Sequence, residues 1–445
     1  MDNIELKAKK FAINAHRGQV RKSDPIKPMI VHPINVGQIL KEYGYDSEVV
    51  AAGYLHDVVE DTKYTLKDIE KEFGKNIASL VDGASEPDKS LSWEERKQHT
   101  IDRTKKLDQR HKAIICADKI SNLEDFRFLS EINGKYDFSA FKRGFDSQKW
   151  YYTEIYNSLL VNDSIDNPML VRLKELIDYI YNDQRDDLFI KDTIFKNNNE
   201  EYIKLKQFHY RKNEIYKLMN VLNHKKPYII EITGTPRTGK TTLINNLYDF
   251  FHKHGFNVCY IEEFTTSKKY KEEIKPFLKD KMKKIVNLEI PKNILMNIKE
   301  AVKQNYDIII VDRGLLDRLI WVDRLYLKDG MTKKEYENYK KKYLPIIKKD
   351  IDLIIATVTD SNTSLKRDYL GNLSLEKRSF LNQQNIDEYN TSLYNISNLT
   401  KEENINFNIV DTTNKNQREV SFEVVDIILS SMKDEILKRV KEEFE

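Results

Sequence analysis

The stretch YIIEITGTPRTGKTTLINNLYDFF, residues 228–251, decides the fold of the second half of the chain. It begins with a short apolar run rich in β-branched residues, which is typical of a buried strand. A turn with the spacing G-x-x-x-x-G-K-[ST] follows, and an amphipathic helix follows the turn. Strand, turn and helix in this order predict a phosphate-binding loop, because backbone N–H groups and a helix N-terminus attract an anion.

The residue types in this loop predict binding of Mg²⁺ and ATP. Lys240 would neutralise the β and γ phosphates, and Thr241 would ligate Mg²⁺. The residues expected around the nucleotide phosphates are Gly234, Thr235, Pro236, Arg237, Thr238, Gly239, Lys240, Thr241 and Thr242.

Four more strand-like runs follow the loop. They are NVCYIEE (257–263), DIIIVD (307–312), DLIIATVTD (352–360) and INFNIVDTT (405–413). Helical stretches separate these runs, and strands that alternate with helices predict a parallel sheet with helices on both faces. The second half is therefore expected to be an α/β domain.

The first half has a different pattern. Apolar residues recur at three- and four-residue spacing in its segments, as in amphipathic helices, and no strand-like alternation stands out. A polar stretch with an Asn cluster, residues 186–200, reads as a loop, and a helix over 201–223 follows it. We expect an all-α domain over 1–186, a loop and connecting helix over 187–222, and the α/β domain over 223–445. The helical segments of the first half lie at 11–20, 32–44, 47–61, 66–83, 95–107, 111–126, 147–160 and 168–182.

Composition limits the class of protein. Lys and Arg total 74 and Asp and Glu total 71, which leaves a formal charge of +3 and no global pull towards nucleic acid or a membrane surface. No apolar run approaches the roughly 18 residues of a spanning helix, and the charged N-terminal residues predict no secretory signal. Two cysteines, Cys116 and Cys259, exclude a disulfide framework and fit a cytoplasmic location.

Four polar residues of the first half, in the stretch LHDVVEDT (55–62), indicate a metal site. His56 and Asp57 are followed at i+4 by Glu60 and Asp61, so a helix would place an imidazole and three carboxylates on one face. Such crowding of carboxylates is costly without a cation. A bound divalent ion would remove the repulsion.

Two further residues complete a candidate ligand set. His32 lies in IVHP and Asp118 lies in an otherwise apolar helix. With His56 and Asp57 they offer two nitrogens and two oxygens, a mixture that suits manganese, iron or zinc better than calcium. A metal there would lower the pKa of bound water. Taken alone, His56-Asp57 could be a chance pair, and Asp118 could be a core residue whose hydrogen bonds are satisfied. The occurrence of all these residues in one chain favours the metal site.

The first half resembles the HD superfamily of metal-dependent phosphohydrolases, and within it the hydrolase domain of RelA/SpoT proteins and the small alarmone hydrolases. The matching stretches are FAINAHRGQVRK, IVHPINVGQIL, AAGYLHDVVEDT, LVDGASE and ADKISNL. The resemblance implies removal of the 3′-pyrophosphate from guanosine-3′,5′-bis(diphosphate), ppGpp, or a related nucleotide. It implies manganese held by His32, His56, Asp57 and Asp118, water positioned or deprotonated by Glu60 and Asp61, and nucleotide held by Arg21, Lys22 and Asn122.

The chain departs from that family's pattern at two places. The stretch SDPIKPMIV, residues 23–31, is longer than usual. Asp125 stands three residues after Asn122, where the family's base pocket usually has Thr, and an acid there would change base preference or weaken nucleotide binding. His16 is expected to be structural or to support a ligand from outside the metal shell.

The second half resembles P-loop kinases of the thymidylate and deoxynucleoside kinase-like group. Asp312 and Arg313 end a buried strand, like that group's acid-Arg motif. The resemblance implies that Asp312 contacts Mg²⁺ through water and that Arg313 contacts the transferring phosphate or the acceptor. Glu262 and Glu263 end the second strand, and the resemblance implies that one of them is the general base. A basic segment, LKRDYLGNLSLEKRSF (365–380), resembles a lid with Arg367 and Arg378 as phosphate-stabilising candidates.

Together these features predict a bifunctional nucleotide enzyme, a metal-dependent phosphohydrolase fused to an ATP-dependent kinase. Its expected partners are nucleotide substrates, with no membrane, and its oligomeric state stays open. One alternative is a hydrolase regulated by an ATP-binding domain that transfers no phosphate. Another is an enzyme that processes nucleic-acid ends, for which the basic stretch 269–284 is the only sequence support.

Overall fold

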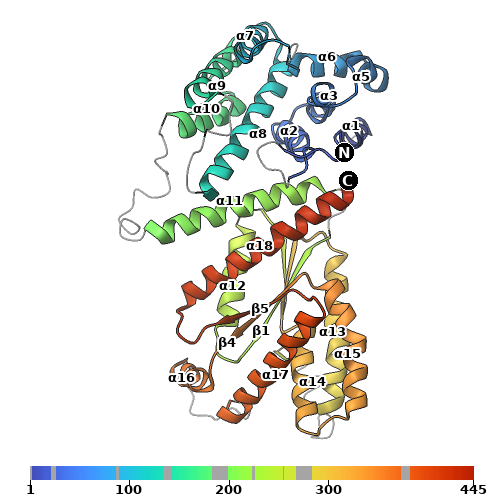
Figure 1. The fold of residues 1–445 in the computed structure, drawn as a ribbon, viewed down its shortest axis with the longest axis vertical. Helices are drawn as coiled ribbons and strands as arrows, with labels where there is room; N and C mark the ends of the chain where they lie inside the picture. The colour runs from blue at the N-terminus through green and yellow to red at the C-terminus, as the bar shows by residue number, and fades with distance from the viewer. Residues whose placement is uncertain are drawn as a thin grey trace. The chain divides into compact units, whose positions relative to one another are not determined.

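The computed structural model describes residues 3–21, 27–86, 90–133, 138, 143–182, 199–222, 226–253, 255–266, 283–371 and 381–444. The chain divides into two compact units, Met1–Asn223 with Ile436–Glu445, and His224–Glu435. Helices form the described part of the first unit, and a sheet flanked by helices forms the second (Figure 1). Among the described residues, no helix is both long and apolar enough to cross a membrane.

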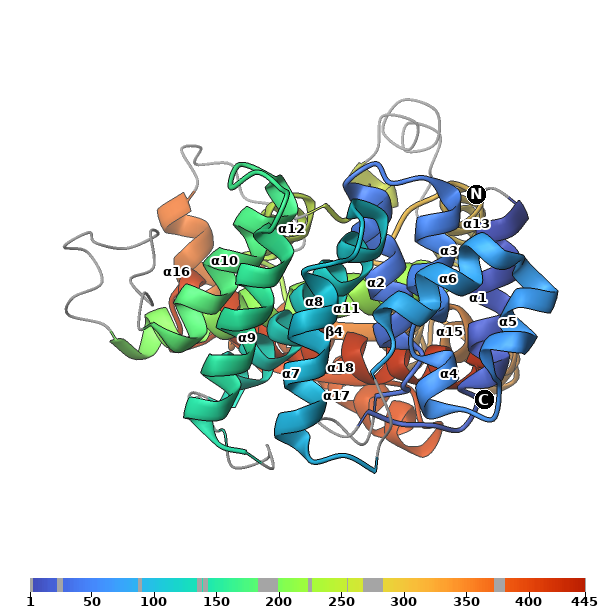
Figure 2. The same cartoon turned by 90° about the horizontal axis from the view of Figure 1, so that it is seen from above.

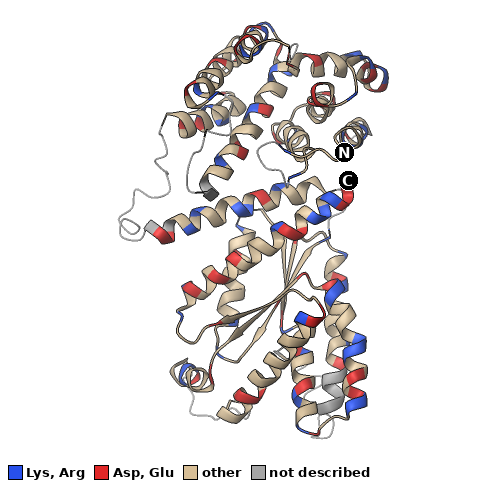
Figure 3. Cartoon of the chain, in the orientation of Figure 1, with Lys and Arg blue, Asp and Glu red and all other residues tan. Residues whose placement is uncertain are grey.

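The first unit is helical, as predicted. An isolated antiparallel bridge joins Val20 to Pro28. Acidic and basic side chains are interspersed over the helices of both units (Figure 3), in keeping with the balanced composition. The helices are α1 (Asn3–Ala15), α2 (Val31–Glu42), α3 (Ser47–Leu55), α4 (Val58–Asp61), α5 (Leu66–Phe73), α6 (Lys75–Ala84), α7 (Trp93–Thr104), α8 (Gln109–Asn133), α9 (Phe145–Leu160), α10 (Pro168–Tyr181) and α11 (Asn199–Val221).

Close packing of α2 against α3 positions the first candidate site. A Cβ atom at Gly37 would lie 2.2 Å from the Tyr54 ring, and one at Gly53 would lie 2.5 Å from a Leu40 methyl group. The two glycines therefore let the helices approach each other closely. Because α2 carries His32 and α3 leads into His56, this approach brings the two imidazoles together.

Three predicted helices of the first unit end or break earlier than expected. The helix expected over 47–61 is interrupted at His56 and Asp57, between α3 and α4. The helix expected over 66–83 is broken at Gly74, whose φ of 86° is left-handed and favours glycine. The helix expected over 11–20 ends at Ala15. In each case the apolar spacing continued past the point where the backbone turns.

The final predicted helix of the first half is present as α11. It packs against α2 and α8 within the first unit. The buried side chains of α11 include Phe208, Ile215 and Leu218. The last ten residues of the chain also belong to this unit. The division of the chain into domains at 1–186, 187–222 and 223–445 stays a prediction. The loop expected over 186–200 lies almost wholly outside the described residues.

The second unit is an α/β domain with a five-stranded parallel sheet in the order β2-β3-β1-β4-β5. All five strands predicted from the sequence are confirmed. The elements are β1 (Tyr228–Gly234), α12 (Lys240–His252), β2 (Val258–Ile261), η1 (Phe264–Thr266), α13 (Lys283–Val302), β3 (Ile308–Asp312), α14 (Leu315–Leu327), α15 (Lys333–Asp350), β4 (Leu353–Val358), α16 (Ser361–Gly371), α17 (Gln383–Glu402), β5 (Phe407–Asp411) and α18 (Gln417–Phe444).

The central strand β1 is buried along its whole length, as a strand covered on both faces must be. Its neighbours place Asp312 beside Ile232 and Thr357 beside Gly234. Gly234 has a φ of 125°, and a Cβ there would lie 1.9 Å from the Thr357 carbonyl oxygen. The first loop residue is therefore restricted to glycine. The carboxyl ends of the strands meet at one edge, where ligands bind in open α/β sheets.

Candidate active sites

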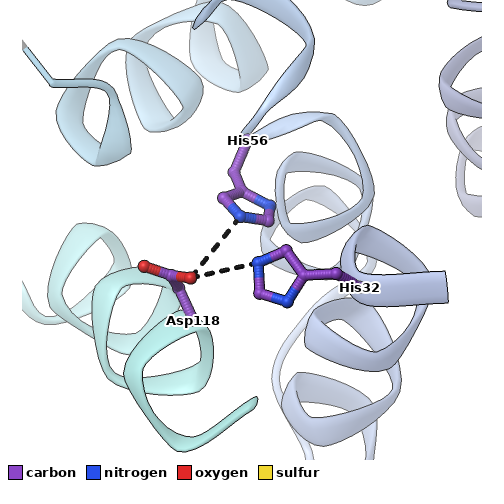
Figure 4. Close-up of side chains that lie close together, drawn as sticks. All are labelled: His32, His56 and Asp118. Carbon is purple, nitrogen blue, oxygen red and sulfur yellow. Dashed lines mark ion pairs between the residues drawn. The ribbon is translucent and has the colours of Figure 1, made fainter. Parts of the chain in front are cut away.

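The first unit brings all four predicted metal ligands close to one another. Ligand atoms of His32, His56 and Asp118 all lie within 4.8 Å of one another. The closest approaches are 3.1 Å from His32 Nε2 to Asp118 Oδ1 and 3.8 Å from His56 Nε2 to the same oxygen (Figure 4). The fourth residue, Asp57, has carboxylate oxygens 3.2 Å from His56 Nε2 and 3.6 Å from His32 Nε2. These residues come from α2, the α3–α4 turn and α8.

The histidine rings are held so that their Nε2 atoms face this cluster. His32 Nδ1 lies 3.0 Å from Ser121 Oγ, and His56 Nδ1 lies 2.9 Å from the Gly53 carbonyl oxygen. The outer contact of a metal-binding histidine fixes its tautomer and ring orientation. His56 Nε2 is buried and has no hydrogen-bond partner among the described residues. An unsatisfied nitrogen beside two carboxylates fits a bound cation.

The electrostatics of the cluster favour ionised carboxylates. Burial opposes ionisation of Asp118, but Lys119 and the two imidazoles outweigh it and hold the pKa of Asp118 well below its ordinary value. Asp57 is likewise held below its ordinary pKa by His56 and His32 against the effect of burial. Burial lowers the pKa of His32, whereas Asp57 and Asp118 outweigh burial and raise the pKa of His56. The carboxylates thus favour a positive charge between them and the imidazoles, and a bound cation would supply that charge in place of a proton on His56.

Glu60 and Asp61 border the cluster from α4. Burial raises the pKa of Glu60 to about 7, and its Oε1 accepts a hydrogen bond from the Glu86 backbone N–H. The Asp61 carbonyl oxygen accepts a hydrogen bond of 2.7 Å from Gln19 Nε2, and Gln19 Oε1 lies 2.9 Å from His16 Nδ1. His16 is thus joined to α4 through Gln19, which fits the expected supporting position.

A pocket of about 710 Å³ opens beside the cluster. One part of its wall carries Arg96 and Lys97 of α7, which pair with Glu86, and Lys119 of α8, which pairs with Asp118. Sequence reasoning missed these three basic residues, because nothing in their spacing distinguishes them from a solvated helix face. Another part is apolar and aromatic, formed by Phe126, Leu129, Tyr152 and Tyr181. Figure 2 shows α8 with α9 and α10 on one side of it and α2 on the other.

Arg21 and Asn122 lie together at the pocket, as the resemblance implied. Arg21 Nη2 donates to Asn122 Oδ1 at 3.0 Å, and Asn122 Nδ2 donates to Asp118 Oδ1 at 2.6 Å. Asp125 lies 3.4 Å from Arg21 Nη2 and accepts from Lys27 Nζ at 3.1 Å. Lys22 lies outside the described residues.

The phosphate-binding loop of the second unit follows β1. Gly239 has a left-handed backbone and stands immediately before α12. Lys240 is buried, and its Nζ donates to the carbonyl oxygens of Gly234 and Thr235 at 3.1 and 2.6 Å. Burial, with the nearby Arg313, lowers its pKa to about 7. An anion in the loop would offset both effects and favour the charged lysine.

Other loop residues are fixed by contacts to neighbouring helices and strands. Thr238 Oγ1 lies 2.6 Å from Thr357 Oγ1, and the Pro236 carbonyl oxygen accepts from Ser364 Oγ at 2.9 Å. Arg237 donates from Nε to Asp368 of α16 at 2.6 Å. Thr241 and Thr242 are exposed at the start of α12.

Strand β3 ends at a charged cluster. Arg313 adopts a φ of 53°, which is uncommon for a residue other than glycine. Its Nε lies 3.4 Å from Glu263 Oε2, and its Nη1 donates to Asp317 Oδ1 at 2.9 Å. Asp312 lies beside this cluster at the carboxyl end of β3, and Tyr260 Oη donates to it at 3.3 Å. Glu262 is exposed. The structure therefore joins Glu263 to Arg313 and leaves Glu262 on the surface.

The predicted lid is described in part. Arg367 of α16 donates to the Thr412 carbonyl oxygen at 2.6 Å and to Thr412 Oγ1 at 3.0 Å, so its guanidinium is bound to the loop after β5. Arg378 and most of the basic stretch 269–284 lie outside the described residues. That Arg367 stabilises a phosphate stays a prediction. To do so, its guanidinium would have to leave Thr412.

Two regions of the chain match known families. Residues 8–135 match an HD domain family, and residues 229–404 match an AAA domain family. A structure of thymidylate kinase from Candida albicans, 19% identical, covers 46% of this chain and 92% of its own, with a TM-score of 0.36. The second unit has the loop sequence G-x-x-x-x-G-K-T directly after the central strand of a five-stranded parallel sheet, which is the arrangement of a P-loop fold.

Curated relatives match the first unit. A Danio rerio protein named guanosine-3′,5′-bis(diphosphate) 3′-pyrophosphohydrolase MESH1 is 38% identical over 124 residues, which are 27% of this chain and 68% of that protein. A Streptomyces coelicolor GTP pyrophosphokinase is 40% identical over 117 residues, and the chain spans only 14% of its length. Through its first unit, the chain belongs to the HD-domain family that includes the MESH1-type 3′-pyrophosphohydrolases.

Proposed function

We propose that the first unit is a metal-dependent hydrolase that removes the 3′-diphosphate from a nucleotide such as ppGpp. The observation that carries the proposal is the cluster of His32, His56 and Asp118, which lines a large pocket together with Arg96, Lys97 and Lys119. The named activity of the Danio rerio relative supports it.

Each group of residues has a role in the proposed reaction. His32, His56, Asp57 and Asp118 would hold a divalent cation, which we propose to be manganese. When bound, the cation would supply Lewis-acid chemistry and lower the pKa of the attacking water.

Residues around that centre would orient the water and the nucleotide. Glu60 and Asp61 lie at the pocket beside the cluster, where they would accept the proton of the water. Arg96, Lys97 and Lys119 would stabilise the negative charge of the diphosphate. Arg21 and Asn122 would hold the nucleoside part, with Lys22 proposed from the family resemblance alone.

One assay tests the hydrolase. Purified protein is incubated with Mn²⁺ and ppGpp, the nucleotides are separated by ion exchange, and Asp61→Ala is compared with Asp102→Ala, an exposed acid on α7. We expect conversion to GDP in the wild type and in Asp102→Ala, and none in Asp61→Ala. Conversion that is equal in all three proteins would remove Asp61 from the mechanism.

We propose that the second unit transfers the γ-phosphate of Mg²⁺-ATP to a nucleoside or nucleotide. A simple ATP sensor needs the loop with Lys240 and Thr241, but it needs no acid-arginine pair at the acceptor side. Glu263, Arg313 and Asp312 lie at the edge of the sheet that carries the loop. Their clustering favours phosphotransfer over the regulatory alternative.

Glu263 is the better general base of the two candidates left open by the sequence. Its carboxylate is half-buried and lies beside Arg313, whereas that of Glu262 is exposed. Asp312 would bind Mg²⁺ through water, and Arg313 would contact the transferred phosphate.

Transfer of label from γ-³²P-ATP across a panel of nucleosides and nucleotides tests the kinase. We expect a labelled product with at least one acceptor and no label with Lys240→Ala. ATP binding without transfer to any acceptor would favour the regulatory alternative. Salt-sensitive binding of RNA or DNA ends would instead favour the end-processing alternative.

A further inference from the structure

We infer that the Glu86 carboxylate occupies the place of a substrate phosphate on Arg96 and Lys97, and that it competes with the pyrophosphate product for these two cations. The inference rests on the hydrolase function proposed above and adds the residue that limits how tightly the pocket holds phosphate. All three residues line the pocket. Lys97 Nζ pairs with Glu86 Oε1, and Arg96 Nη1 lies 3.2 Å from Glu86 Oε2. One carboxylate therefore pairs with both of the α7 cations that line the pocket.

Glu86 lies next to the proposed reaction centre. Its backbone N–H donates a hydrogen bond to Glu60 Oε1, and Glu60 lines the pocket beside the metal cluster. The third cation of the pocket wall, Lys119, pairs with Asp118 of the cluster at 2.6 Å. A diphosphate whose inner phosphate lies at the cluster would therefore meet Glu86 with its outer phosphate.

Arg96 has a hydrogen-bond donor that Glu86 does not use. Its Nε is buried and has no hydrogen-bond partner among the described residues. An unsatisfied buried donor costs free energy, which an incoming acceptor would recover. A phosphate group has three terminal oxygens and more negative charge than a carboxylate, and a guanidinium can bind it through two parallel hydrogen bonds. The donors of Arg96 therefore suit a phosphate better than they suit Glu86.

The charge of Glu86 opposes the binding of phosphate. Burial favours its neutral form, but Lys97, Lys119 and Arg96 outweigh burial and hold the pKa of Glu86 below its ordinary value. The ionised carboxylate neutralises cations that a phosphate would use, and it repels an anion beside it. Among the residues that line the pocket, six acids face four lysines and arginines. One divalent cation would only balance this excess, so removal of the Glu86 charge would leave the pocket net positive.

This competition would assist release of the product. Hydrolysis turns the ester oxygen of the attacked phosphate into a free, ionisable oxygen, so pyrophosphate binds cations at least as strongly as the substrate did. Glu86 is an anion of the protein itself that can take the place of the product on Arg96 and Lys97. The product can then leave without two partly buried cations losing their partner, which would be costly.

The test compares the wild type with Glu86→Gln, which keeps the shape of the side chain and removes its charge. Asp82→Asn is the matched control, because Asp82 of α6 pairs with Arg103 of α7 at 2.5 Å and neither residue belongs to the described lining of the pocket. Hydrolysis of ppGpp gives KM, and inhibition by added pyrophosphate gives Ki, both at constant free Mn²⁺. Melting temperatures and bound Mn²⁺ show that each variant is folded and loaded.

We expect Glu86→Gln to lower both KM and the Ki of pyrophosphate about tenfold, since a like charge beside the ligand opposes binding. Asp82→Asn, which removes an exposed ion pair, should leave both constants within about twofold. In a Lys97→Gln background the effect of Glu86→Gln on Ki should shrink to about threefold or less, because one of the two contested cations is absent.

Two results would overturn the inference. An unchanged or raised Ki in Glu86→Gln would mean that Glu86 only holds Arg96 and Lys97 in place. An effect of Glu86→Gln that is equally large without Lys97 would mean that Glu86 and pyrophosphate do not compete for that lysine.

A binding measurement separates this inference from the hydrolase proposal. If the wild type hydrolyses no ppGpp while Mn²⁺ is bound, the proposed reaction is wrong. Calorimetric binding of pyrophosphate to the Mn²⁺-loaded wild type and to Mn²⁺-loaded Glu86→Gln then tests Glu86 alone. Binding that is about tenfold tighter in Glu86→Gln supports the competition. Equal affinities, or no binding to either protein, overturn it.

Discussion

The two candidate active sites of this chain are built in opposite ways. In the second unit the candidate phosphate-binding site is one continuous loop, residues 234–241, which directly follows a buried strand. In the first unit the metal cluster takes residues from α2, the α3–α4 turn and α8, separated by up to 86 positions between His32 and Asp118. A contiguous site depends on local backbone geometry, whereas the dispersed site depends on how helices pack.

Their electrostatics differ as well. The loop site presents backbone N–H groups and a lysine, which attract an anion directly. The metal cluster presents carboxylates and imidazoles, which repel an anion until a cation is bound. With the proposed functions, the first site would therefore need a metal before it could act on a phosphate group, whereas the second would need Mg²⁺ only as a partner of the nucleotide.

The largest expected effect comes from removing a metal ligand. Asp118→Asn should lower hydrolysis of ppGpp by about a thousandfold, because it removes an anionic oxygen that both histidines face, and loss of an outer partner alone typically costs 10- to 100-fold. Release of pyrophosphate and bound Mn²⁺ are measured together. Phosphotransfer by the second unit should not change. Full hydrolysis with less than stoichiometric metal would disprove the ligand role.

A substitution in the phosphate-binding loop tests whether the two sites act independently. Lys240→Ala should lower ATP-dependent transfer by about 10²–10³-fold, the usual loss for one group that stabilises developing charge. Hydrolysis of ppGpp, measured on the same preparation, should stay within about twofold, since no described residue of the metal cluster belongs to the second unit. A parallel fall in hydrolysis would show that the two sites are coupled.

A smaller effect distinguishes the two glutamates after β2. Glu263→Gln should lower kcat for phosphotransfer about a hundredfold, as expected when a general base is lost. Glu262→Gln, its exposed neighbour, should stay within about threefold. The measurement is kcat with a saturating acceptor. An equal loss of kcat in the two variants would mean that Glu263 is not the general base in preference to Glu262.

The smallest effect concerns stability in the second unit. A Cβ at Gly314 would lie 2.5 Å from Glu231 Oε2, and Glu231 also accepts hydrogen bonds from the backbone N–H groups of Leu316 and Asp317. Gly314→Ala should therefore lower the free energy of unfolding by about 1–3 kcal/mol, the usual cost of overpacking. Calorimetry should show a lower transition for the second unit alone. An unchanged transition would mean that the Glu231 side chain moves aside without cost.

The sequence by itself determined the local features of this protein. All five strands and the phosphate-binding loop followed from apolar runs and glycine spacing, because a buried strand and a tight turn are encoded by adjacent residues. The candidate metal ligands were predicted from their residue types and from the family resemblance. The break at His56 and Asp57 was not found, since the apolar period continues through it.

Only the tertiary structure decided which distant residues meet. It placed Arg96, Lys97 and Lys119 on one pocket wall, joined Glu263 and not Glu262 to Arg313, and attached Arg367 to Thr412. It also set Asp125 between Arg21 and Lys27. Each of these results depends on the packing of separate helices and strands. Residue spacing along one chain does not specify such contacts, because many arrangements of the same helices and strands bury equal apolar area.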